Sequence, residues 1–303
     1  MYTTIIYIIS SILLFLFGIK LLSKTLTSVY SNKIKDILSK YINSDFTALL
    51  LGIILTALCQ SSNAITIISL SLINANYLSF SKGLIIIIGS NIGTTITAFL
   101  ISFDFDLLIP IFLFIGFILY IKENKKNVGL IFISLGITFY SLNIMSINFS
   151  KLISVEYIYT FINRLNNSSF FSFIFGVFLS SLIQSSSASI GIIQKLSNDG
   201  LILLSSSISF MLGANIGTTL TGLISSFASD TKTKKVASIN VVFNLITSIL
   251  FLIILPSYSS IVSFIGNKLH FNNMSKIALS HFLYNAICVL IFYYIYTKRK
   301  KVD

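Results

Sequence analysis

The sequence has 303 residues, of which 55% are hydrophobic and only 10% are charged, and its mean hydropathy is +0.92. Soluble globular proteins carry about 25% charged residues, so this composition excludes a water-soluble enzyme. The formal net charge of +12 does not indicate nucleic-acid binding, because the Lys residues are scattered in short stretches between long apolar runs. We therefore expect an all-α integral membrane protein.

The first apolar run, Thr3–Leu22, is long enough to cross a bilayer, which takes about 20 helical residues. It is followed by an amphipathic pattern made of Leu26, Val29, Ile34, Ile37, Leu38 and Tyr41. Apolar residues at this spacing predict a helix with one apolar face, and we expect that helix to lie along the membrane surface.

The next apolar segment, Phe46–Ala75, predicts a re-entrant hairpin. A straight helix of this length would extend roughly 45 Å, whereas the bilayer core is about 30 Å thick. Its polar cluster Gln60-Ser61-Ser62-Asn63 lies at the middle, so two half-helices with the cluster at the tip fit the length better. Two further spans are expected at Leu84–Leu100 and Leu107–Ile121.

The second half of the sequence repeats this order at an offset of 124 residues. Gln60-Ser61-Ser62 recurs as Gln184-Ser185-Ser186, and the motif Gly89-Ser90-Asn91-Ile92-Gly93-Thr94-Thr95 recurs as Gly213-Ala214-Asn215-Ile216-Gly217-Thr218-Thr219. The matching elements are a span at 128–145, an amphipathic segment at 152–165, a hairpin at 170–199, the span with the second motif and a span at 236–255. One helix, 277–297, remains at the end.

The repeat divides the chain into three parts. We predict a first transmembrane repeat at 1–122 with its hairpin at 46–75, and a second at 123–256 with its hairpin at 170–199. The final helix and a basic cytoplasmic tail occupy 257–303. Three crossings separate the hairpins, so the repeats are predicted to be inverted, with about seven crossings in all.

The distribution of basic residues predicts the orientation in the membrane. With the N-terminus outside, 15 of the 21 Lys and Arg residues fall on the cytoplasmic side and five fall outside, and Lys20, inside the first span, is not counted. Cytoplasmic loops carry an excess of Lys and Arg. We expect a multi-pass protein of the cell membrane with its N-terminus outside and its C-terminus in the cytoplasm.

The two hairpin tips predict a site for an anion. Inverted repeats with broken helices are the architecture of secondary transporters, whose sites lie at the midplane where the breaks meet. Ser is a favoured N-cap, and a helix start offers free N–H groups and the positive end of the helix dipole. The candidate residues are Gln60, Ser61, Ser62, Asn63, Gln184, Ser185, Ser186 and Ser187.

The duplicated Gly-x-Asn-Ile-Gly-Thr-Thr motif predicts a cation site, because a compact hard cation prefers oxygen ligands. The candidate residues are Asn91, Thr94, Thr95, Asn215, Thr218 and Thr219. No carboxylate is predicted near mid-depth, and Arg164 and Arg299 lie outside the spans. An anion held by neutral groups needs a co-bound cation, which indicates sodium symport. We expect no catalytic residues and no cofactor, with the sodium ion as co-substrate.

Two further polar pairs lie four residues apart on the last predicted helices. Asn240 with Asn244, and His281 with Asn285, share a helix face, and we interpret both pairs as contacts between helices. Packing is the expected role of His281.

The duplicated motifs, with the late pattern Lys276-x-Ala278-x-x-His281, resemble the type II sodium–phosphate cotransporters and their bacterial relatives over about residues 1–297. The resemblance implies sodium-driven uptake of inorganic phosphate by a protein that is not an enzyme. The resemblance implies that residues 184–187 and the equivalent residues of the first half form the substrate site and the sodium site. Gln60, Gln184 and Ser185 are therefore also candidate sodium ligands.

The sequence departs from the family pattern in two ways. Asn63 occupies the place of a third Ser, which changes the ligand set of the first tip. Many bacterial relatives append a helical domain that resembles the phosphate-regulatory proteins, whereas this sequence stops at Asp303. We expect a phosphate-regulatory partner, if one acts here, to be a separate protein.

Alternatives remain open. The same scaffold could carry another anion or export phosphate, and a non-transporting membrane partner or sensor is the alternative from another class. The expected partners are phosphate, sodium and the lipid bilayer, without nucleic acid, and a homo-oligomer is left open.

Overall fold

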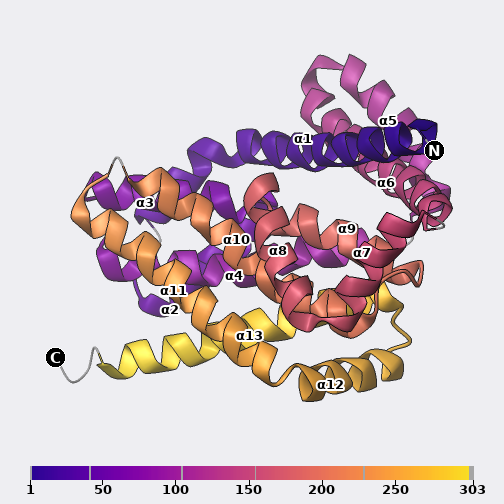
Figure 1. The fold of residues 1–303 in the computed structure, drawn as a ribbon. Coiled ribbons are helices and arrows are strands. Elements are labelled where there is room, and N and C mark those ends of the chain that lie inside the picture. The colour runs from indigo at the N-terminus through magenta and orange to yellow at the C-terminus, as the bar shows by residue number, and fades with distance from the viewer. Residues whose placement is uncertain (1, 41, 104, 154, 228, 300–303) are drawn as a thin grey trace.

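The computed structural model describes residues 2–40, 42–103, 105–153, 155–227 and 229–299. These residues form thirteen α-helices and two short 3-10 helices, and the described part of the chain contains no strand (Figure 1). The α-helices are α1 Tyr2–Lys40, α2 Asp45–Cys59, α3 Ser62–Asn74, α4 Phe80–Ser102, α5 Ile109–Ile121, α6 Lys126–Leu152, α7 Glu156–Asn167, α8 Ser169–Ile183, α9 Ser186–Asn198, α10 Leu204–Ser226, α11 Thr231–Ile253, α12 Leu255–Lys268 and α13 Asn273–Arg299. Tyr41 of the predicted amphipathic pattern and the end of the predicted basic tail lie outside the described residues.

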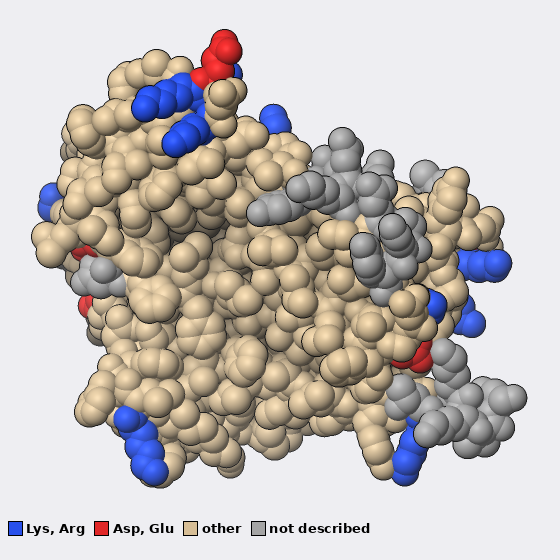
Figure 2. Space-filling model, turned by 180° about the vertical axis from the view of Figure 1, so that it is seen from behind, with Lys and Arg blue, Asp and Glu red and all other residues tan. Residues whose placement is uncertain are grey.

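Six of the described helices are long and apolar enough to cross a membrane. They are α1 over Tyr2–Val29, α4, α6, α10, α11 and α13. Large apolar side chains such as Leu13, Phe17 and Ile253 are exposed on them. Figure 2 shows a broad uncharged face with the visible Lys and Arg side chains around its rim. An apolar exterior of this extent suits lipid rather than water, and the prediction of an all-α integral membrane protein is confirmed.

Three elements differ from their predictions. The expected span Leu107–Ile121 contains α5, whose 13 residues extend only about 20 Å. The prediction of a separate first surface helix is wrong, because α1 continues to Lys40 without a break; neither Pro nor Gly follows Gly18 in it. An additional helix, α12, lies between α11 and α13, and Pro256 stands in its first turn, where a missing N–H costs nothing.

The second predicted surface helix is present as α7. It meets α8 at an angle of 110°. One of its faces buries Ile162 and Leu165, whereas Tyr157 and Tyr159 are exposed. This pattern is that of an amphipathic helix, as the sequence predicts.

The first hairpin is formed by α2 and α3, which are separated only by Gln60 and Ser61. Its two outer ends return to the start of α4. Lys82 Nζ of α4 donates a hydrogen bond to the carbonyl oxygen of Ile42, before α2 (2.7 Å), and Gly83 of α4 lies against the side chain of Ile73, at the end of α3. The segment 46–75 therefore folds back on itself.

The second hairpin, α8 and α9, closes in the same way. Asn166, just before α8, donates through Nδ2 to the carbonyl oxygen of Leu201, just after α9 (3.0 Å). Ser206 Oγ of α10 donates to the Asn166 carbonyl oxygen (3.3 Å). Ser206 and Asn166 lie 124 residues after Lys82 and Ile42. The contact between them is therefore the counterpart of the Lys82–Ile42 contact in the first hairpin.

Close helix contacts through glycine also recur at the same offset. A Cβ added to any of these glycines would overlap a backbone carbonyl of the partner helix, so the two helices approach more closely than larger residues would allow. The pairs are Gly52 with Ile86 and Gly89 with Leu49 between α2 and α4, and Gly176 with Phe210 and Gly213 with Phe173 between α8 and α10.

The two hairpins are opposed along α4 and α10. α4 starts at the base of the first hairpin, and the carbonyl oxygen of Ala98, near its end, accepts a hydrogen bond from Gln194 of α9 (3.1 Å). α10 starts at the base of the second hairpin, and just beyond its end Asp230 N donates to Asn74 Oδ1 at the end of α3 (3.1 Å). The hairpin bases thus lie at opposite ends of the same two helices, which supports the predicted inversion of the repeats.

Candidate functional site

Each hairpin turns at a glutamine in the left-handed conformation. Gln60 has φ 52° and Gln184 has φ 60°, and each ends the first helix of its hairpin. The following serine is the N-cap of the second helix, so that Ser61 Oγ accepts from Ala64 N and Ser185 Oγ accepts from Ala188 N, both at 3.2 Å. The sequence prediction that these serines start the second half-helices is confirmed.

The helix starts leave backbone donors unused at the tips. Among the described residues, the N–H groups of Ser62 and Asn63 in α3, and those of Ser186 and Ser187 in α9, have no hydrogen-bond acceptor. The first N–H groups of a helix have no partner within it and carry its positive dipole end. Two such groups of donors are therefore available to an anion.

The two tips touch each other through Asn63. Its Nδ2 donates to the carbonyl oxygen of Gln184 (2.7 Å), and its Oδ1 accepts from Thr221 Oγ1 of α10 (3.1 Å). The Asn that replaces the expected third Ser therefore bridges the first tip to the second tip and to α10.

A cavity of about 470 Å³ lies at the meeting point of the tips. Its wall contains all eight residues predicted to bind the substrate, which are Gln60, Ser61, Ser62, Asn63, Gln184, Ser185, Ser186 and Ser187. One face of α1 completes it with Leu16, Ile19, Lys20 and Ser23. We call it the large cavity. Its volume is that of a small-molecule site.

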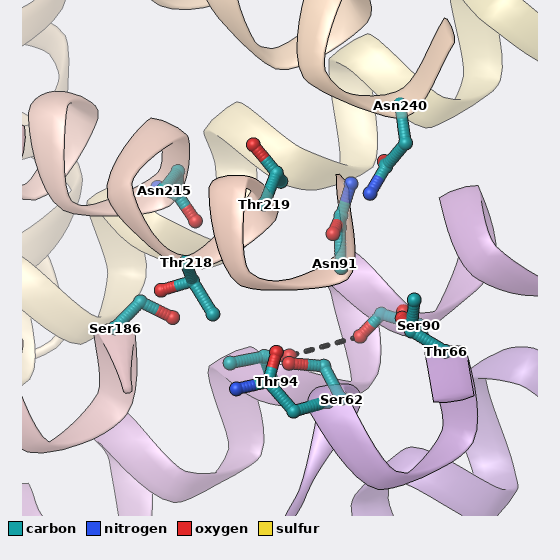
Figure 3. A pocket seen from close by; sticks show the side chains of 12 residues that line it. Ser62, Thr66, Ser90, Asn91, Thr94, Ser186, Asn215, Thr218, Thr219 and Asn240 are labelled. Atoms are coloured by element: carbon teal, nitrogen blue, oxygen red, sulfur yellow. Dashed lines mark hydrogen bonds between the residues drawn. The ribbon is translucent and has the colours of Figure 1, made fainter. Parts of the chain in front are cut away.

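A second, much smaller cavity of about 20 Å³ adjoins it. In Figure 3, side chains of α3 and α4 face Asn215, Thr218 and Thr219 of α10 across it. Apart from Gly222, its wall consists of polar side chains, namely Ser62, Asn63, Thr66, Ser90, Asn91, Thr94, Ser186, Asn215, Thr218, Thr219 and Asn240. This small cavity has room for about one water molecule or a bare ion.

Five of the predicted sodium ligands line the small cavity, and they are Asn91, Thr94, Asn215, Thr218 and Thr219. Gln60, Gln184 and Ser185 line the large cavity instead. Thr95 lines neither cavity; its side chain is fully buried, and its hydroxyl donates to the Ile92 carbonyl oxygen (2.7 Å). The two copies of the motif therefore differ at their last Thr.

The two cavities share part of their walls. Ser62, Asn63, Ser186 and Thr218 belong to both. Two buried side-chain atoms at the site have no partner among the described residues, Gln60 Oε1 and Asn91 Nδ2. Buried polar groups without partners are costly, and a ligand or water in the cavities would supply the missing partners.

His281 of α13 supports the small cavity from behind. The ring is fully buried, and its Nε2 lies 3.1 Å from Asn215 Oδ1. Asn215 Nδ2 is already directed to the Met211 carbonyl oxygen (3.0 Å), so its Oδ1 must accept and His281 Nε2 must donate. The residue predicted to serve packing thus orients a side chain of the small cavity.

Several of the lining residues were not predicted from the sequence. Lys20 carried a signal, since a charged residue inside an apolar span is rare and usually functional. Asn240, interpreted as a contact between helices, lines the small cavity. Thr66, Ser90 and Ser23 carried no signal, because single hydroxyl residues in membrane helices commonly bond to the preceding turn.

The two cavities differ in the charge of the residues that line them. Among the described residues, no Asp or Glu lines either cavity, whereas Lys20 lines the large one. The expectation of a wholly neutral site is therefore wrong at this position. The large cavity combines a cation, two helix starts and hydroxyl and amide groups, which suits an anion. The small cavity offers neutral oxygen atoms, which suit a small cation.

The fold and the site together define a helical multi-pass membrane protein with a polar interior made from two opposed hairpins. The model of the Na+/Pi-cotransporter family matches residues 14–147 and 149–302. The chain belongs to this family, which is a family of transporters and not of enzymes, and phosphate transport is the activity that membership supports.

Two relatives are similar to the chain over most of its length. The chain is 30% identical over 283 residues to "Uncharacterized protein YqeW" of Bacillus subtilis, covering 93% of this chain and 91% of that protein. It is 24% identical over 291 residues to "Putative inorganic phosphate export protein YjbB" of Escherichia coli K12, covering 95% of this chain and 53% of that protein. The chain thus spans about half the length of YjbB. No solved structure matches it.

Proposed function

We propose that this protein is a sodium-coupled symporter of inorganic phosphate that works by alternating access. Phosphate binds in the large cavity between the hairpin tips, and sodium binds in the small cavity on neutral oxygen atoms. The observation that carries this proposal is the wall common to both cavities, formed by Ser62, Asn63, Ser186 and Thr218.

The common wall gives a physical reason for coupling. A sodium ion in the small cavity draws the Ser62 hydroxyl oxygen toward itself, and the O–H group of Ser62 then points away from the ion, toward the large cavity. The positive charge of the ion also favours an anion a few ångströms away, in surroundings less polar than water. Each ion therefore improves the site of the other, and the coupling is reciprocal.

The opposed hairpins suit alternating access. Transporters built from inverted repeats expose a fixed midplane site to one side and then to the other by moving one repeat against its counterpart. In this proposal the two repeats, 1–122 and 123–256, exchange roles on the two sides of the cell membrane. The N-terminus is outside and the C-terminus is cytoplasmic.

The proposal is tested with the purified protein in liposomes. Uptake of labelled phosphate is measured with an inward sodium gradient and with potassium in its place. We expect uptake with sodium only, and its loss in Q184A and S186A while membrane insertion of both variants remains intact. Equal uptake with and without sodium would overturn the coupling, and full uptake by both variants would overturn the site.

Phosphate export is the second candidate, and the observation that favours it is the similarity to YjbB, whose name describes export. A secondary transporter moves its substrate in the direction set by the gradients. Efflux from phosphate-loaded liposomes, measured with sodium inside or outside, separates the two directions. Competition by sulfate or arsenate tests whether another anion is the substrate, and absence of transport of every anion would favour a partner or sensor protein.

A further inference from the structure

The large cavity has one charged side chain in its wall among the described residues, that of Lys20. Lys20 lies on α1, in the same turns as Leu16, Ile19 and Ser23, which also line the cavity. α1 is held at this place by Phe15, which is fully buried and packs on Gly191 of α9. Lys20, which is itself exposed, lies at the edge of the face of α1 that lines the cavity.

The position of Lys20 along α1 is costly for a charge that serves no purpose. The apolar part of α1 runs from Tyr2 to Val29, and Lys20 precedes Val29 by nine residues, about 14 Å along the helix. A lysine at the centre of a span costs about 2.5–3.5 kcal/mol on insertion scales, and such residues usually face a wet cavity and mark a substrate pathway.

Lys20 has no counter-charge in the described part of the chain. Among the described residues, no carboxylate lies within ion-pair distance of its ammonium group, and it has no hydrogen bond. The N-terminal ends of α3 and α9 also lie at the cavity, and each carries the positive end of its helix dipole. The large cavity is thus a concentration of positive potential, and no acidic residue among those described lines it.

Lys20 also breaks the symmetry of the two repeats. At the 124-residue offset its position corresponds to Ile144 of α6, which is apolar and lines neither cavity. The repeated motifs supply donors from both halves, whereas the cation comes from the first half alone.

We propose that the Lys20 ammonium group is a direct ligand of the transported anion in the large cavity. This inference rests on the proposed function, because it names a residue that binds phosphate there beyond the repeated motifs. A charge-assisted hydrogen bond is stronger and shorter than a neutral one. Its loss should raise the phosphate concentration for half-maximal uptake about tenfold or more.

The test uses a cysteine at this position and reagents that add a charge to it. Native Cys59 and Cys288 are both buried, and the untreated and treated wild-type protein controls for them. K20C is reconstituted in liposomes and treated with an aminoethyl methanethiosulfonate, which restores a primary ammonium, or with a sulfonatoethyl analogue, which adds a negative charge. K24C, one turn further along α1 at an exposed position outside the cavity wall, is the matched control.

We expect K20C to need about tenfold more phosphate, the aminoethyl group to restore most of the affinity and the sulfonatoethyl group to abolish uptake. Inorganic phosphate should slow the labelling of K20C, and K24C should respond to none of these treatments. If the wild type takes up phosphate but K20C behaves as K24C does, the Lys20 proposal is overturned and the proposed function stands.

The opposite failure is also distinguishable. If the wild type transports no phosphate while phosphate still protects K20C from labelling, Lys20 is an anion ligand and the transport proposal fails. If phosphate neither is transported nor protects K20C, both proposals fall.

Discussion

Asn63 of the first hairpin donates a hydrogen bond from Nδ2 to the carbonyl oxygen of Gln184 at the tip of the second, at 2.7 Å. The donor and the acceptor are 121 residues apart in the chain. The contact links the two hairpin tips at the wall common to both cavities, so the side chain that departs from the repeated pattern is one that joins the tips.

Replacing Asn63 should therefore weaken transport. N63A removes both the bond to Gln184 and the bond from Thr221, and we expect phosphate uptake to fall about tenfold, as for the loss of one to two hydrogen bonds. N63S, whose hydroxyl is shorter, should lie between N63A and the wild type. S71A is the control, because Ser71 is exposed on the same helix and its hydroxyl donates only to the carbonyl oxygen of Ile67. Equal uptake by N63A and S71A would contradict a bridging role.

The threonines of the repeated motif offer a matched test of the small cavity. Valine has nearly the shape of threonine but lacks the hydroxyl. T94V and T218V should raise the sodium concentration for half-maximal uptake about tenfold, because both residues line that cavity. T95V should not, because Thr95 lines neither cavity. A sodium dependence of T95V as weak as that of T94V would contradict the placement of sodium here.

His281 is expected to act through Asn215. H281F removes the donor to Asn215 Oδ1 and leaves the amide less well oriented, so the sodium concentration for half-maximal uptake should rise several-fold. The phosphate KM at saturating sodium should stay unchanged, since His281 lines neither cavity. H281Q, which keeps an N–H donor, should restore part of the sodium affinity, and H270Q at the exposed second histidine should have no effect. A parallel loss of phosphate affinity in H281F would indicate a general packing defect.

The close helix contacts through glycine predict an effect on stability. G176A places a Cβ against the Phe210 carbonyl oxygen in the α8–α10 contact, and G52A does the same between α2 and α4. Overpacking of this kind costs about 1–3 kcal/mol, which should lower the melting temperature of the purified protein in detergent. G222A is the control, because its Cβ would meet only Thr66 Cγ2, at 3.2 Å. If all three variants have the same melting temperature, the close backbone contact does not determine the stability of the protein.

The repeated motifs carried most of what the sequence could predict. A polar cluster in the middle of a segment too long for one crossing indicates a break, and the break was found at Gln60 and Gln184. The caps at Ser61 and Ser185 followed from the chemistry of helix starts. These features are local, so the sequence alone could establish them.

The features that the sequence could not predict depend on which side of a helix meets a neighbour. Thr94 and Thr95 are adjacent and chemically identical, and both hydroxyls bond within α4, so only the packing of α4 decides that Thr94 lines the small cavity and Thr95 does not. Lys20 and Asn240 likewise gain their positions from α1 and α11 crossing the hairpins. The continuity of α1 was missed because a change from an apolar to an amphipathic pattern does not by itself end a helix.

The opposed hairpins have a mechanical consequence. α4 and α10 each bind the base of one hairpin at one end and the base of the other at the opposite end. In the proposed alternating-access cycle, a displacement at the base of one hairpin acts through α4 and α10 on the base of the other hairpin. The two sides of the site would then open in turn rather than together, which would prevent a continuous pore and the leakage of ions through it.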